Sequence, residues 1–188
     1  MKTLVVEKQN LKHNLKIIKD ITEKNKTKII AVIKGNGYGL GLVEYAEFLA
    51  DNGIEIFAVA TVEEAIKLRK NGIKQDILMM SSTAVKEDVE ALVENDIIIT
   101  IGSNEAVEVA EEVAKSKNKK IRAHLKIDTG FGRYGFIYTE KEKILESLKK
   151  LENRRSIYTF FYCIFWRWKR NSRTIQKIYV NGWISKEK

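Results

Sequence analysis

The chain has 188 residues, no proline, one cysteine and a formal net charge of +9. This length suits one ordinary domain or a piece of a larger protein. The sequence contains neither an apolar run of about 18 residues nor a charged-then-apolar N-terminus, so we expect no membrane association and no export signal. Cys163 by itself excludes an internal disulfide, which fits the cytoplasmic location that we expect.

The positive charge is concentrated near the C-terminus. Residues 1–150 contain 25 Lys and Arg against 23 Asp and Glu, whereas residues 151–188 contain 9 against 2 and all three tryptophans. A nucleic-acid-binding domain would need a basic surface, which the nearly neutral first 150 residues do not predict. We therefore expect no nucleic acid as a partner of this main part of the chain.

Short β-rich runs alternate with amphipathic stretches of helical length. The predicted strands are residues 28–34, 55–61, 76–82, 96–102 and 121–128, with a sixth starting near Ile157. Helical patterns occupy residues 10–25, 42–53, 62–72, 86–96 and 104–118, and most of them close on Asn-Gly or Asn. Strands buried on both faces and followed by helices predict parallel βαβ units. Their close spacing is typical of a (β/α)8 barrel, so the expected fold is α/β, an incomplete TIM-type barrel, with an open doubly wound sheet as the alternative.

The stretch AVIKGNGYGLGL, residues 31–42, places a lysine directly after a strand and glycines at alternate positions beyond it. Active sites of barrels lie where strands end, and Lys34 is at such an end. A partly buried amine has a lowered pKa and can attack an aldehyde to form a Schiff base. The glycines would let the backbone approach a ligand, and Tyr38 offers a hydroxyl to an anionic oxygen. The alternative is a flexible loop with a lysine that reaches into solvent.

The stretch HLKIDTGFGRYGF, residues 124–136, contains a second group of polar side chains. His124, Lys126 and Asp128 share one strand face, and Arg133 follows in a glycine-rich loop. Two cations at a strand end suit an anionic ligand. The alternatives are an ion pair between Lys126 and Asp128 and a structural role for His124, while His13 is expected at the surface.

The two stretches together resemble the N-terminal motifs of the alanine racemases, which are pyridoxal-phosphate enzymes with a (β/α)8 barrel and a C-terminal β-domain. The likeness runs from the N-terminus to about Thr159. It implies that Lys34 holds the cofactor covalently and serves as a catalytic base, and that Tyr38 lies at the cofactor phosphate. It also implies that Arg133 binds the phenolic oxygen of the cofactor near the substrate carboxylate, and that Lys126 supports Arg133 and is carbamylated in some members.

The resemblance implies interconversion of L- and D-alanine in a homodimer, which supplies D-alanine for the cell wall, with no metal. Proton transfer on both faces of the substrate needs a second base. In the family this is a tyrosine from the C-terminal domain, and an arginine faces the pyridine nitrogen. Neither has a counterpart here, so the expected domain is a partial pyridoxal-phosphate-binding barrel, residues 1–159, inactive by itself as a truncated chain.

The likeness breaks at Phe160, where the family typically has a histidine. Back-translation from Phe160 with two added bases gives a frame that reads HFSIAFFGDGKETVEQFKKFM, which restores that histidine. The two glycines of this frame do not depend on the choice of codons. In the shifted frame the last two bases of the tgg codon of Trp166 or Trp168 join the first base of the following Arg or Lys codon, and any such triplet encodes glycine. Residues 160–188 are therefore interpreted as an out-of-frame, non-native tail.

Two other functions stay open. One is a non-catalytic pyridoxal-phosphate-binding protein, since single-barrel relatives without a second domain exist. The other is nucleic-acid binding through the aromatic and basic residues of the tail, Trp166, Arg167, Trp168, Lys169 and Arg170.

Overall fold

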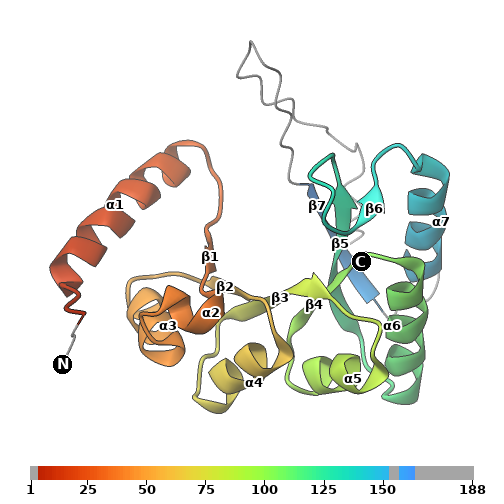
Figure 1. Cartoon of the computed structure of the whole chain (residues 1–188), viewed down its shortest axis with the longest axis horizontal. Helices are drawn as coiled ribbons and strands as arrows, with labels where there is room; N and C mark the ends of the chain where they lie inside the picture. The colour runs from red at the N-terminus through yellow and green to blue at the C-terminus, as the bar shows by residue number, and fades with distance from the viewer. Residues whose placement is uncertain (1–3, 153–156, 164–188) are drawn as a thin grey trace, which may run out of the picture. The chain divides into compact units, whose positions relative to one another are not determined.

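Strands and helices alternate along the chain in the computed structural model (Figure 1). The structure describes residues 4–152 and 157–163, and for residues 151–152 and 157–163 it gives secondary structure only. Residues 1–81 with 91–98 belong to one compact unit, and residues 82–90 with 99–188 belong to another. The proposed nucleic-acid-binding tail, residues 166–170, lies outside the described residues.

The first unit contains parallel strands joined through helices. Its elements are α1 (Lys8–Lys24), β1 (Ile30–Val32), α2 (Lys34–Tyr38), α3 (Leu42–Asp51), β2 (Ile56–Val59), α4 (Val62–Lys70) and β3 (Asp76–Ser82). Strand β2 pairs in parallel with β1 on one side and with β3 on the other. The strands are rich in apolar residues, and Phe57, Val59 and Ile77 are fully buried. This burial supplies most of the driving force for the unit.

The helices of the first unit end as the Asn-Gly pairs predict. Asn52 is the C-cap of helix α3, and Asn71 is the C-cap of α4. The glycine that follows each cap has a positive φ, 80° at Gly53 and 85° at Gly72. This conformation turns the chain toward the next strand and satisfies the last helical carbonyl groups.

Arg69, near the end of α4, ties two loops of the first unit together. Its guanidinium donates to four backbone carbonyl oxygens: Nε to Asn95 at 3.0 Å, Nη1 to Ile73 at 2.6 Å and to Gln75 at 3.1 Å, and Nη2 to Asp96 at 3.0 Å. The planar fork of arginine donors permits this arrangement, which an ammonium group cannot reproduce. The loops before β3 and before β4 are thereby joined to α4.

The second unit repeats the alternation of helix and strand. Its elements are α5 (Lys86–Glu94), β4 (Ile98–Ile101), α6 (Asn104–Ser116), β5 (Ile121–Asp128), β6 (Phe136–Ile137), α7 (Lys141–Glu152) and β7 (Ile157–Cys163). Helix α5 and strands β3 and β4 each have residues in both units. Strand β5 pairs in parallel with β4, β6 and β7. Strand β7 is the sixth strand expected near Ile157, and its pairing with β5 runs through Cys163, past the predicted boundary at Thr159.

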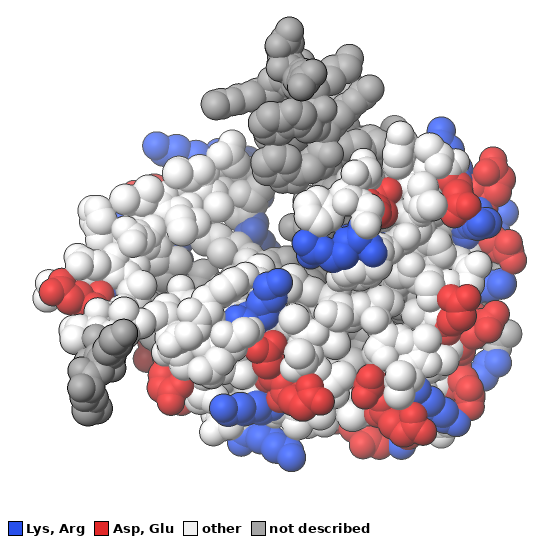
Figure 2. All heavy atoms as spheres, viewed as in Figure 1, with Lys and Arg blue, Asp and Glu red and all other residues white. Residues whose placement is uncertain are grey.

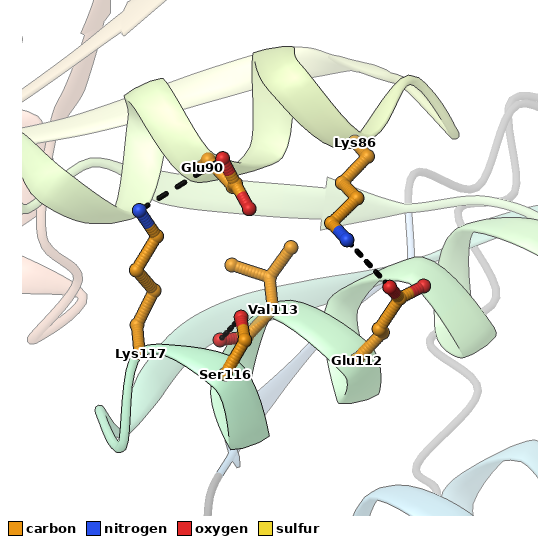
Figure 3. A network of polar contacts seen from close by, with 6 residues as sticks. All are labelled: Lys86, Glu90, Glu112, Val113, Ser116 and Lys117. Carbon is orange, nitrogen blue, oxygen red and sulfur yellow. Dashed lines mark hydrogen bonds and ion pairs between the residues drawn. The ribbon is translucent and has the colours of Figure 1, made fainter.

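Charged side chains join the first half of α5 to α6 in the second unit (Figure 3). Lys86 Nζ lies 2.6 Å from Glu112 Oε1, and Lys117 Nζ lies 3.8 Å from Glu90 Oε2. The bond to Glu112 raises the pKa of Lys86. Both pairs are at the surface, where solvent screens them, so each contributes little to stability. They set how the two helices face each other more than they stabilise them.

The fold class predicted from the sequence is confirmed. All five expected strands and the five expected helices are present, and parallel strands connected through helices are consistent with an incomplete (β/α)8 barrel. The general expectation of strands buried on both faces holds for β4, which is buried at every position, but not for β5, whose burial alternates as the polar residues at every second position predict. The sequence analysis also did not identify β6 and α7.

Basic and acidic side chains are interspersed along the lower right of the face drawn in Figure 2. This mixture matches the near balance of charge in residues 1–150. Among the described residues, no helix has both the length and the apolar character needed to cross a bilayer.

Candidate functional site

Lys34 begins the short helix α2, and Ile33 is the one residue between it and the end of strand β1. The preceding Ile33 is fully buried, and its backbone N–H donates to the carbonyl of Ala58 at 2.9 Å. Its own carbonyl accepts from the N–H of Gly37 at 2.9 Å. Lys34 is half-buried. Ile33 is thus fixed in the core, while Lys34 itself is only partly buried.

The turn after Lys34 is left-handed. Gly35, Asn36 and Gly37 have φ values of 62°, 54° and 65°, and Tyr38 has a φ of 53°. Residues with a Cβ avoid this region at a cost of about 1–2 kcal/mol each, so the conformation has to be held by surrounding contacts. Asn36 Oδ1 accepts from the N–H of Leu42 at 3.1 Å, which ties the turn to the start of α3.

The backbone of the turn is open to a ligand at two of its glycines. A Cβ added at Gly35 or at Gly39 would have no other atom within 4 Å. Tyr38 is 64% exposed, so its hydroxyl is accessible to a phosphate group. A primary amine, an open backbone and an accessible hydroxyl therefore lie within five residues.

Strand β5 holds the second group of predicted residues. His124, Lys126 and Asp128 are half-buried on one face, while the residues between them are buried on the other, as the period-two pattern predicts. Burial lowers the pKa of His124, so the imidazole is neutral near pH 7. His13 is exposed on α1, as predicted.

The loop after β5 is folded around the carboxylate of Asp128. Its Oδ1 accepts from the backbone N–H of Gly130 at 3.0 Å and from that of Gly132 at 3.1 Å. These two hydrogen bonds are the main reason that the pKa of Asp128 is lowered, and the charge of Lys126 has the smallest effect. Asp128 therefore orders the loop that presents Arg133, and an ion pair with Lys126 is not its main interaction.

Aromatic rings lie beside the two cations of this loop. Lys126 Nζ is 4.8 Å from the centroid of the Tyr134 ring, and Arg133 Cζ is 4.6 Å from the centroid of the Phe131 ring. Burial raises the pKa of Tyr134, so it is a neutral phenol near pH 7. Such contacts favour a fixed direction for each cation. The sequence analysis had not identified either ring as a partner.

Gly135 brings the end of the loop against β5. A Cβ on this residue would lie 2.9 Å from the backbone oxygen of Lys126 and 3.0 Å from its Cγ. Only a glycine permits this approach, so the sequence position of Gly135 fixes how the loop closes.

The predicted site residues lie in both units. Lys34 and Tyr38 are in the first unit, four residues apart on one turn, and Lys126 and Arg133 are in the second, on β5 and on the loop that follows it. One residue that the sequence analysis missed is Glu64, whose carboxylate accepts from the backbone N–H of Asn36 at 3.1 Å. The TVEE sequence at 61–64 predicts a helix cap, but it does not reveal this contact with the lysine turn.

Comparison with known proteins identifies the family. Residues 6–178 match the family model described as alanine racemase, N-terminal domain. This match extends past Thr159, and the domain boundary there stays a prediction. Alanine racemase 2 of Caldanaerobacter subterraneus subsp. tengcongensis is 38% identical over 148 residues, which are 78% of this chain and 38% of that protein. The alanine racemase of Carboxydothermus hydrogenoformans is 39% identical over 157 residues, 83% of this chain and 42% of that protein.

A solved structure of an alanine racemase has a similar fold. The alanine racemase of Clostridium difficile 630 superposes with a TM-score of 0.76 at 35% identity, over 85% of this chain and 41% of that one. The chain spans about two-fifths of the length of the curated relatives that it matches. Because the family model covers most of the chain, this protein belongs to the alanine racemase family and matches its N-terminal domain.

Proposed function

We propose that this chain provides the pyridoxal-phosphate-binding part of an alanine racemase and that Lys34 is the residue that holds the cofactor. The observation that carries the proposal is the position of Lys34, half-buried between the fully buried Ile33 and a left-handed glycine turn. Membership of the alanine racemase family supports alanine as the substrate.

The proposed chemistry removes the proton from the Cα of the amino acid and returns a proton to the same carbon. When bound, pyridoxal phosphate supplies an electron sink for the Cα of the amino acid. Lys34 Nζ removes the proton from Cα, or returns it, on one face of the substrate. Tyr38 would hold a phosphate oxygen through a hydrogen bond from its hydroxyl, and Arg133 would hold the phenolic oxygen through a hydrogen bond from its guanidinium.

Several other chain residues support these groups. Ile33 and the turn hold the backbone of Lys34, and Asp128 orders the loop of Arg133. We propose that Lys126, on the strand before that loop, supports Arg133. The sequence analysis finds no counterpart of the second base among the 188 residues, so for this chain alone we predict capture of the cofactor without racemisation.

The test is capture of pyridoxal phosphate by the purified chain. An absorbance band near roughly 420 nm should appear on mixing, and borohydride should fix the cofactor to Lys34 as shown by peptide mass. Lys34→Ala should abolish the band, whereas Lys28→Ala, which removes an exposed lysine just before β1, should retain it. Labelling at other lysines, with Lys34→Ala unaffected, would overturn the proposal.

A further inference from the structure

Glu64 joins the lysine turn to the end of the neighbouring strand. Its Oε1 accepts from the backbone N–H of Asn36 at 3.1 Å, and its Oε2 accepts from the backbone N–H of Ala60 at 3.1 Å. Asn36 is two residues after Lys34, and Ala60 is the first residue after β2. One carboxylate thus bridges the carboxyl ends of two adjacent parallel strands.

The sequence around Glu64 predicts a more local role. Thr61 is the N-cap of α4, and its Oγ1 accepts from the N–H of Glu64 at 3.2 Å. In an ordinary capping box the glutamate three residues after the cap bonds back to the N–H of the capping residue itself. Here the carboxylate goes to Ala60 and to Asn36, 28 positions away in the sequence. The local motif therefore supports a contact between different elements.

The contact with Asn36 acts on a turn that needs support. Asn36 has a φ of 54°, a region that residues with a Cβ rarely adopt, and it lies among glycines, which have the largest freedom to lose on folding. A charge-assisted hydrogen bond to its N–H is stronger than a neutral one. Buried Ile33 fixes the chain before Lys34, and the Glu64 bond to Asn36 fixes it just after.

We propose that Glu64 is a positioning residue for Lys34, which holds the left-handed turn so that the amine is presented to pyridoxal phosphate. This inference rests on the proposed function, because it requires that Lys34 captures the cofactor. Glu64 acts through the backbone of Asn36 and does not touch the reacting atoms.

The experiment compares two variants of the full chain that weaken α4 in different ways. Glu64→Gln keeps the size of the side chain but replaces one acceptor oxygen by an NH2 group, so one of the two backbone N–H groups loses its partner. Thr61→Ala removes the cap of the same helix and leaves the carboxylate in place. Each is titrated with pyridoxal phosphate at 420 nm, and unfolding by urea is followed in parallel.

A positioning role predicts different results for the two variants. Glu64→Gln should weaken capture by roughly 5- to 30-fold, as expected when a backbone donor loses its partner, under conditions where the chain is folded. Thr61→Ala should bind as the wild type does, although it is less stable. If Glu64 only caps α4, the two variants will capture the cofactor equally well, and that result would overturn the proposal.

A second measurement needs no cofactor, and its result in the wild type does not depend on a variant that might unfold. The amide of Asn36 is at the surface, so its hydrogen exchange in the native chain reports whether its N–H is held. We expect slow exchange in the wild type and in Thr61→Ala, and fast exchange in Glu64→Gln. Fast exchange in the wild type refutes the role of Glu64, even if Lys34 captures the cofactor. Slow exchange without capture at Lys34 refutes the proposed function, and the inference with it.

Discussion

Two glycines in the loop that carries Arg133 allow backbone strain to be separated from steric contact. Gly130 and Gly135 have almost the same φ, 117° and 119°, so alanine at either position costs about 1–3 kcal/mol through the backbone alone. At Gly130 the added Cβ would meet nothing within 4 Å, whereas at Gly135 it would lie 2.9 Å from the backbone oxygen of Lys126. That oxygen belongs to β5 and cannot rotate away, so overpacking adds about 1–3 kcal/mol at Gly135 only.

The assay is urea unfolding of Gly130→Ala and Gly135→Ala, followed by circular dichroism. We expect both variants to be less stable than the wild type, and Gly135→Ala to be the less stable of the two by about 1–3 kcal/mol. Equal losses would mean that the loop moves freely away from β5. In that case the close approach of Gly135 would not fix the loop of Arg133.

Three further predictions concern other parts of the chain. Arg69→Met should lower the free energy of unfolding by about 3 kcal/mol, because four backbone carbonyl groups lose a charged donor. The control, Lys67→Met, replaces an exposed lysine and should change the free energy of unfolding by less than about 0.5 kcal/mol. Urea unfolding would measure both, and equal effects of the two substitutions would contradict the reasoning. Burial lowers the pKa of His124, so as the pH falls below about 6.5 the imidazole takes up a proton more readily in the unfolded chain than in the folded one. The free energy of unfolding should therefore drop between about pH 7.5 and about pH 5.5 in the wild type, and should drop less in His124→Gln. An equal drop in both would show that the imidazole is not the cause. Sequencing the gene across codons 155–190 should show that two bases are missing before the codon for Phe160. Restoring these two bases should give a longer reading frame. A gene that needs no added bases there would refute the frameshift.

The strands were predictable because each is a short apolar run with β-branched residues, bounded by polar residues. The residues that line the predicted site were also visible, since Lys34 and Arg133 stand in glycine-rich segments directly after strands. Their roles in binding stay predictions. The left-handed turn was not predictable in detail: glycines permit a positive φ, but the same conformation at Asn36 and Tyr38 is imposed by contacts that the local sequence does not contain.

Two misses have a common physical cause. Helix α7 has the apolar spacing of an amphipathic helix, yet the sequence analysis made no prediction for residues 141–152. On its buried face is Ser147, whose Oγ lies 2.8 Å from Oδ1 of Asn104, a polar pair that no hydrophobic pattern indicates. Glu64 was missed for a similar reason, because its partner is distant in sequence. Local patterns identify elements, but pairings between elements depend on the fold.

The alternating burial of β5 has a consequence for how this protein tolerates insertions. A single residue inserted within Ile121–Asp128 would turn every later side chain to the opposite face and place Lys126 and Asp128 in the core. Strand β4 is buried at all four positions, so the same insertion there would exchange one apolar face for another. Insertions and deletions between related sequences should therefore be absent from β5 and should collect in the segment between α6 and β5, where the chain is exposed.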